Sequence, residues 1–127
     1  MGPDLVPAGV STPRRLIVNA DDFGRSPSIN AAVIRAHREG ILTTASLMVN
    51  EPACAEAVSM ARQHPRLGVG LHLTLLCGHS ALTPAELPGL VNSKREFTNN
   101  PVVAGSRYFF CRRLRDQLRA EIHAQFD

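Results

Sequence analysis

The sequence predicts an α/β fold in which parallel strands alternate with helical crossovers. Three observations support this prediction. Short apolar stretches recur along the chain, a helical pattern with end signals follows each of the first two, and turn residues separate the segments. The expected order is therefore strand, helix, strand, helix, strand, which forms a parallel sheet with right-handed connections.

The first strand is expected at Leu16–Val18, because continuous hydrophobicity is typical of a strand buried on both faces. Residues 1–14 before it are proline-rich and aperiodic, and we expect them to form a flexible leader. Ser26 and Pro27 are the N-cap and first residue of the following helix, and Gly40 marks its end. The apolar residues with helical spacing are Ile29, Ala32, Val33 and Ala36.

The same unit then repeats. Ala45–Val49 is expected to form the second strand, and Asn50 to cap a helix with Pro52 in its first turn. The helix should end near Gln63, because a residue before proline disfavours helical geometry. Leu67–Leu75 follows as a third strand, in which leucine and valine alternate with glycine, histidine and threonine.

The remainder of the chain divides into an irregular stretch and a final helix. Residues 76–106 contain many prolines and asparagines and are expected to form a long loop, a length typical of functional loops. One helix is expected at Arg107–Phe126, with an apolar stripe of Cys111, Leu114, Leu118 and Ile122. No end signal follows, so residues 15–127 are interpreted as the N-terminal portion of a longer domain.

Composition excludes several functional classes. No run of apolar residues reaches the length of roughly 18 that a membrane span needs, and no secretory signal is recognisable, so a cytoplasmic location is expected. The three cysteines have neither disulfide nor zinc-thiolate spacing. The basic residues near the C-terminus lack a nucleic-acid-binding motif, so no nucleic-acid partner is expected.

Asp21 and Asp22 are the strongest candidates for chemistry. They follow the predicted first strand, at the carboxyl edge where parallel α/β folds bind ligands. Two adjacent carboxylates repel each other unless a cation or shared proton relieves the repulsion, so the pair favours a divalent metal site. The alternative is that one of them only caps the next helix or fixes a turn with Gly24.

His72 is expected at the same edge, on the glycine-bearing face of the third strand. Carboxylate and imidazole together form a plausible metal-binding set, although two ligands are fewer than catalytic sites commonly have. The alternative is a histidine satisfied by a backbone partner. His79 follows the third strand and is a weaker candidate that could line the mouth of the site, whereas structural roles are expected for His37, His64 and His123.

Three motifs, Asn19–Gly24, Thr44–Met48 and Gly68–Leu75, resemble the YdjC/ChbG family of carbohydrate deacetylases in order and spacing. The stretch from Asn99–Val102 to Arg107–Phe110 resembles its hopanoid-biosynthesis branch, called HpnK.

The resemblance implies an irregular (β/α) barrel of the polysaccharide-deacetylase type, of which this chain forms the N-terminal part. It implies metal-dependent hydrolysis of an N-acetyl group from an N-acetylglucosamine-type sugar, with lipid-linked hopanoid substrates and a homo-oligomer left open. Asp22 and His72 would bind Mg²⁺ or Zn²⁺, and Asp21 would be the general base, although the two aspartates could exchange roles. A further metal histidine is expected from a downstream segment absent here, so the isolated chain is expected to be inactive.

Two alternatives from other classes remain. A receiver-type phosphoacceptor domain also binds magnesium through an acidic pair, but it needs an aspartate ending the third strand, and residues 67–77 contain none. A non-catalytic remnant that binds sugar or metal without turnover is the second alternative.

Overall fold

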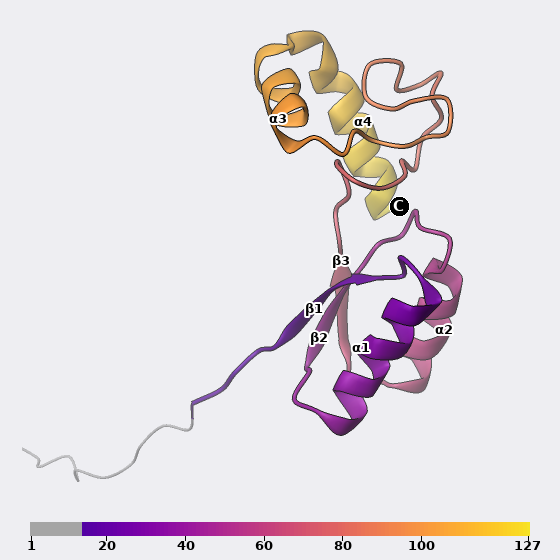
Figure 1. Ribbon diagram of the computed structural model, residues 1–127, viewed down its shortest axis with the longest axis vertical. Coiled ribbons are helices and arrows are strands. Elements are labelled where there is room, and N and C mark those ends of the chain that lie inside the picture. Colours follow the sequence, from indigo (N-terminus) through magenta and orange to yellow (C-terminus); the bar gives the residue numbers. More distant parts are fainter. Residues whose placement is uncertain (1–13) are drawn as a thin grey trace, which may run out of the picture.

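The computed structural model describes residues 14–127, so nearly all of the predicted leader lies outside the described residues. Three strands form one parallel sheet in the order β1-β2-β3, and a helix follows each of the first two (Figure 1). The elements are β1 (Asn19–Phe23), α1 (Pro27–Glu39), β2 (Thr44–Leu47), α2 (Cys54–Gln63) and β3 (Gly68–Leu71). The predicted α/β class and element order are confirmed.

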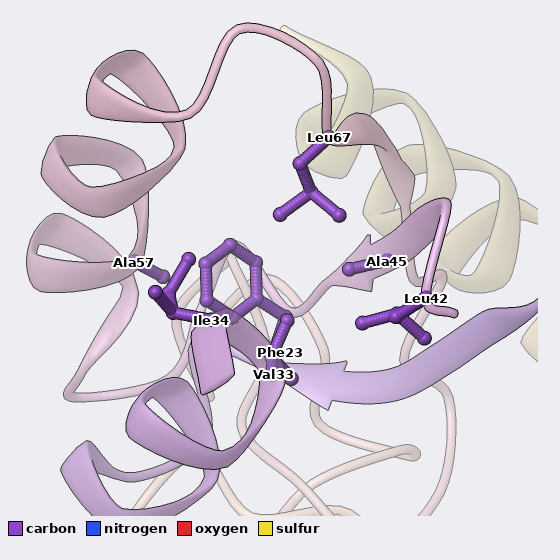
Figure 2. Packing of buried hydrophobic residues seen from close by; sticks show 7 residues of the cluster. All are labelled: Phe23, Val33, Ile34, Leu42, Ala45, Ala57 and Leu67. Carbon is purple, nitrogen blue, oxygen red and sulfur yellow. The ribbon is translucent and has the colours of Figure 1, made fainter. Parts of the chain in front are cut away.

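Phe23 is the centre of the core that joins the sheet to its two helices. Its side chain is fully buried, and Figure 2 shows it among apolar side chains from both helices and the neighbouring strand. Burying a phenylalanine contributes roughly 1.5–3 kcal/mol. The other buried members of this cluster are Val33, Ile34, Leu42, Ala45, Ala57 and Leu67.

Helix α1 has the predicted ends. The Ser26 hydroxyl accepts a hydrogen bond from the Ile29 N–H at 3.3 Å, Pro27 occupies the first turn, and Gly40 is the C-cap. The predicted apolar stripe is only partly right, because Ala32 and Ala36 are exposed. The buried face instead includes Asn30, a polar residue whose amide satisfies several loop groups.

Three strand and helix boundaries differ from the sequence-based expectation. Leu16 and Ile17 lie before β1 and are 74% and 77% exposed, so the expectation of a strand buried on both faces was wrong. Helix α2 begins at Cys54 without a side-chain cap, because residues 49–53 form turns, and Asn50 contacts the His79 carbonyl instead. Strand β3 ends at Leu71, where its pairing with β2 ends.

The single terminal helix expected at Arg107–Phe126 is two helices. Helix α3 spans Pro101–Phe110, the 3₁₀ turn η1 spans Arg112–Leu114, and α4 spans Arg115–Phe126. Asn100 caps α3 by accepting hydrogen bonds from two backbone N–H groups, which starts the helix earlier than expected. Cys111 has an extended backbone and separates the two helices.

Residues 72–127 form a second packed unit beyond the carboxyl ends of the strands (Figure 1). The irregular stretch predicted at residues 76–106 is confirmed only as far as residue 100, because α3 begins at Pro101. Residues 72–100 contain no helix, and only isolated bridges pair His79 with Glu96 and Val91 with Phe97. This stretch nevertheless shares a core with η1, made of Leu87, Leu90, Phe97 and Leu114.

Two buried polar residues of α4 hold the loop that follows β3. Glu121 is fully buried, and its carboxylate accepts hydrogen bonds from the N–H groups of Ala81 and Leu82 at 2.7 and 3.0 Å. Gln125 accepts from the Thr74 N–H at 2.8 Å and donates to the Thr74 carbonyl at 2.7 Å. The apolar stripe predicted for a single helix over residues 107–126 does not include these contacts of α4, because their side chains are polar.

No helix among residues 14–127 is long and apolar enough to cross a membrane.

Candidate active site

The Asp21-Asp22 pair lies at an irregularity in β1. The pairing register between β1 and β2 shifts between Ala20 and Phe23, where β1 contains one more residue than its partner, as in a β-bulge. Ala20 and Phe23 both pack toward the helices even though they are three positions apart, with two residues between them. An alternating strand would place them on opposite faces, so the extra residue keeps Phe23 in the core and re-aims the aspartates.

Asp22 adopts a left-handed backbone conformation with φ of 61°. Aspartate tolerates this region better than most residues, but the conformation still costs on the order of 1 kcal/mol. Gly24 has φ of 96°, and a Cβ atom there would lie 2.9 Å from the Met48 carbonyl oxygen. The Gly24 N–H donates to the buried Asn30 side chain at 2.8 Å. The turn after the aspartates is thus fixed by close packing and hydrogen bonding.

The structure brings Asp22 and His72 together, as expected for side chains at one edge of a parallel sheet. The Asp22 N–H donates to Nδ1 of His72 at 3.3 Å, and Oδ1 of Asp22 lies 3.8 Å from the same nitrogen. Oδ2 of Asp22 forms an ion pair with Arg25 at 3.1 Å. The backbone of His72 is held in place because its backbone N–H donates to the Leu47 carbonyl at 2.8 Å.

Asp21 is exposed and separate from this contact. Its Oδ1 accepts a hydrogen bond from the Asn19 side chain at 3.0 Å, and the same amide group donates to the Ser46 hydroxyl at 3.0 Å. Ser46 is paired in register with Gly70, where a Cβ atom would meet nothing within 4 Å. Asp21 therefore faces an open surface, and Asn19 orients it.

The donors at Asp22 and His72 fit a divalent cation in part. Nitrogen ligands lie about 2.0–2.1 Å and carboxylate oxygens about 2.0–2.2 Å from zinc, so two such ligands of one cation are at most about 4.3 Å apart. The 3.8 Å separation of Oδ1 and Nδ1 is within this limit, but Nδ1 must give up its hydrogen bond from the Asp22 N–H to bind a cation. Within residues 14–127, however, no three histidine, cysteine, aspartate or glutamate side chains gather into a metal-binding group.

A polar cleft of about 340 Å³ lies next to the Asp22–Arg25 ion pair. Its walls come from the loops after all three strands, represented by Arg25, Glu51 and His79, and from residues 92–99. His79 was predicted to line the mouth of the site, whereas Arg25, Glu51 and Asn19 were not predicted to belong to it. A short-range signal existed for Arg25 and Asn19, since they flank the acidic pair, but nothing local marks Glu51.

Of the three cysteines, Cys77 lines the cleft. All three are free thiols, and burial raises the pKa of the Cys54 thiol, which keeps it protonated and poorly nucleophilic near neutral pH.

Comparison with known proteins identifies the family of this chain. The family model described as YdjC-like protein matches residues 15–127. A carbohydrate deacetylase from Geobacillus stearothermophilus is 47% identical over 85 residues, which cover 67% of this chain and 34% of the relative. A chitooligosaccharide deacetylase from Salmonella schwarzengrund is 43% identical over 77 residues, covering 61% of this chain and 29% of the relative.

The fold also matches a solved structure. A candidate cellobiose-phosphate cleavage protein from Enterococcus faecalis superposes with a TM-score of 0.73 at 29% identity, over 86% of this chain and 41% of that one. The chain spans about a third of the length of the curated relatives it matches. With the match over residues 15–127, the chain belongs to the YdjC-like family.

Proposed function

We propose that this chain supplies part of an active site that hydrolyses the N-acetyl group of an amino sugar. The observation that carries the proposal is the contact of Asp22 with His72 at the carboxyl edge of the sheet, with Asp21 beside it. Relatives named carbohydrate deacetylase and chitooligosaccharide deacetylase support the substrate class.

In this proposal Asp22 and His72 are two ligands of a divalent cation, either Mg²⁺ or Zn²⁺. Such a cation, when bound, supplies polarisation of the acetamide carbonyl and a lowered pKa for water. Arg25 neutralises one Asp22 oxygen and limits how that carboxylate can rotate. The donor separation of 3.8 Å supports the assignment, and a third ligand must come from outside the groups described above.

We assign the general base to Asp21. Asp22 is the aspartate next to His72, whereas Asp21 is exposed and its second oxygen has no hydrogen-bond partner among residues 14–127. A carboxylate in that position can accept a proton from an attacking water. Asn19 holds it by one oxygen, which leaves the other oriented toward the open face.

The finer proposals concern the complete protein. We propose that it closes into the irregular (β/α) barrel of the polysaccharide-deacetylase type, and that its sugar is carried on a hopanoid-type lipid. The resemblance of residues 99–110 to the HpnK branch supports the lipid assignment. The exposed apolar side chains of α3, among them Val102, Phe109 and Phe110, also support it.

A second candidate is a binding module that retains metal or sugar affinity without turnover. The observation that favours it is that only two candidate ligands meet within the described residues. The two candidates differ in whether acetate is released once the remaining ligands are supplied.

A chimera tests the function. The 85-residue segment of the Geobacillus stearothermophilus deacetylase that aligns with this chain would be replaced by the matching residues of this chain. Acetate release from N,N′-diacetylchitobiose is expected. It should fall at least about 100-fold in Asp21→Asn, Asp22→Asn and His72→Gln, because each removes a base or a ligand.

Two controls make the result decisive. Circular dichroism must show that the chimera is folded, and the parent deacetylase must release acetate in the same assay. A folded chimera that binds metal but releases no acetate would favour the binding module and overturn the deacetylase proposal.

A further inference from the structure

His79 and Glu51 form a charge-assisted pair beside the proposed catalytic residues. Nδ1 of His79 lies 3.1 and 3.2 Å from the two carboxylate oxygens of Glu51. The backbone N–H of His79 also donates to Oε1 of Glu51 at 2.8 Å. The Glu51 side chain is only 7% exposed, whereas that of His79 is 37% exposed. A buried carboxylate thus holds a partly exposed imidazole by both its ring and its backbone.

The pair fixes which imidazole nitrogen is free. An ionised carboxylate can only accept hydrogen bonds, so the neutral ring must carry its proton on Nδ1. Nε2 is then an acceptor, and it has no hydrogen-bond partner among residues 14–127. A ligand that meets His79 must offer a donor, such as a hydroxyl group.

The surrounding cleft favours a neutral ligand with many hydroxyl groups. Its one cationic side chain, Arg25, is paired with Asp22, and its two acidic side chains, Glu51 and Glu96, accept hydrogen bonds from His79 and from the Asn92 amide. Asn99 adds a side-chain amide that can both donate and accept hydrogen bonds, whereas the Asn92 amide is already bonded to Glu96 and to the Lys94 N–H. The cleft volume of about 340 Å³ is at the lower end of small-molecule sites, which run from about 300 Å³.

We propose that His79, positioned by Glu51, binds a hydroxyl group of the sugar unit adjacent to the one that is deacetylated. This inference rests on the proposed function, because Arg25 joins the cleft to Asp22 and therefore to the reacting sugar. It makes His79 a residue that selects a disaccharide over a monosaccharide.

The test is a titration of the 127-residue chain with N,N′-diacetylchitobiose and with N-acetylglucosamine, followed by NMR of the imidazole groups. The free chain should show His79 protonated at Nδ1. N,N′-Diacetylchitobiose, called chitobiose below, should bind at least about fivefold more tightly than the monosaccharide. His79→Phe keeps a planar ring without nitrogens and should weaken chitobiose binding about tenfold, the usual effect of losing one hydrogen bond, while monosaccharide binding stays unchanged.

His64→Phe is the matched control, since His64 also uses Nδ1 in a hydrogen bond, to the Met60 carbonyl at 2.8 Å. It should leave both affinities unchanged. Glu51→Gln gives a second test, because the new amide can donate to Nδ1 and move the His79 proton to Nε2. That variant should change the imidazole spectrum but weaken chitobiose binding less than His79→Phe does, because a sugar hydroxyl can accept from Nε2–H as well as donate to Nε2.

Three results would overturn the inference: a free His79 protonated at Nε2, no chitobiose binding, or equal chitobiose affinity in His79→Phe and the unsubstituted chain. These outcomes are separate from the acetate-release test. An active chimera whose chitobiose affinity ignores His79 would retain the proposed function and refute the subsite. An inactive chimera whose chitobiose binding depends on His79 would refute the proposed function but retain a role for His79 in binding the disaccharide.

Discussion

The two edges of the sheet each carry two histidines and a cleft, and they differ in what those histidines contact. At the amino edge, Nδ1 of His37 and of His64 each lie 2.8 Å from a backbone carbonyl oxygen, and the two rings meet edge to face at 6.2 Å. At the carboxyl edge, His72 and His79 contact the carboxylates of Asp22 and Glu51.

The comparison shows that neither a histidine nor a cleft identifies the site. The cleft at the amino edge is the larger, about 460 Å³ against 340 Å³, and no acidic side chain lines it. Only the carboxyl edge combines imidazoles with carboxylates and a strained backbone at Asp22. In a parallel α/β fold this is also the edge where functional residues are found, because its loops vary independently of the core.

The largest expected effect concerns how the carboxyl edge is held. Glu121→Ala removes the buried acceptor of the Ala81 and Leu82 N–H groups and should lower the free energy of unfolding by about 3 kcal/mol. Asp116→Ala on the same helix is exposed and should change it by less than about 0.5 kcal/mol. Chemical denaturation measures both changes in the free energy of unfolding, and equal values would show that the hydrogen bonds of Glu121 contribute nothing to stability.

Metal binding separates the two edges directly. His72→Gln should weaken Zn²⁺ binding by the 127-residue chain at least tenfold, roughly 1.4 kcal/mol, because it removes one of two proposed ligands. His64→Gln should leave the affinity unchanged. Isothermal titration with zinc gives both values, and the account of the metal site fails if the two variants lose affinity equally.

Two glycines at the carboxyl edge should respond in opposite ways. Gly24→Ala should destabilise the fold by about 2 kcal/mol, because it combines a positive φ with a Cβ atom 2.9 Å from the Met48 carbonyl. Gly70→Ala places its methyl group in open space and should be neutral or stabilising by up to about 1 kcal/mol. Thermal unfolding followed by circular dichroism tests the pair, and a stable Gly24→Ala would contradict the described turn.

The smallest expected effect tests the strain at Asp22. Asp22→Gly removes the left-handed penalty whereas Asp22→Ala keeps it, so the glycine variant should be the more stable by about 1 kcal/mol. Both should lose the zinc affinity that depends on this carboxylate. Urea denaturation compares them, and an alanine variant as stable as the glycine variant would show that no strain is stored there.

Much of the fold could be predicted because its signals are local. Ser26, Pro27 and Gly40 mark the ends of α1 within the sequence itself, and the alternation of short apolar stretches with helices determines a parallel sheet. The convergence of Asp22 and His72 followed from the rule that such strands share an edge.

The missed features depend on contacts between distant residues. Glu51 meets His79 across 28 positions, and Glu121 reaches Ala81 across 40, so neither pattern is visible in a short window. The bulge at Asp21-Asp22 was missed for a related reason, since it exists only relative to the neighbouring strand. The burial of Leu16 and Ile17 was predicted wrongly because hydrophobicity alone does not show that a partner covers a segment.

Acetate release by the chimera tests most directly the claim that the carboxyl edge carries the chemistry. With N,N′-diacetylchitobiose as substrate, His72→Gln should lower kcat/KM by at least about 100-fold, which corresponds to about 2.7 kcal/mol of transition-state stabilisation. His64→Gln should stay within about twofold, an effect below 0.5 kcal/mol. Equal losses in the two variants, or full activity in His72→Gln, would contradict the account.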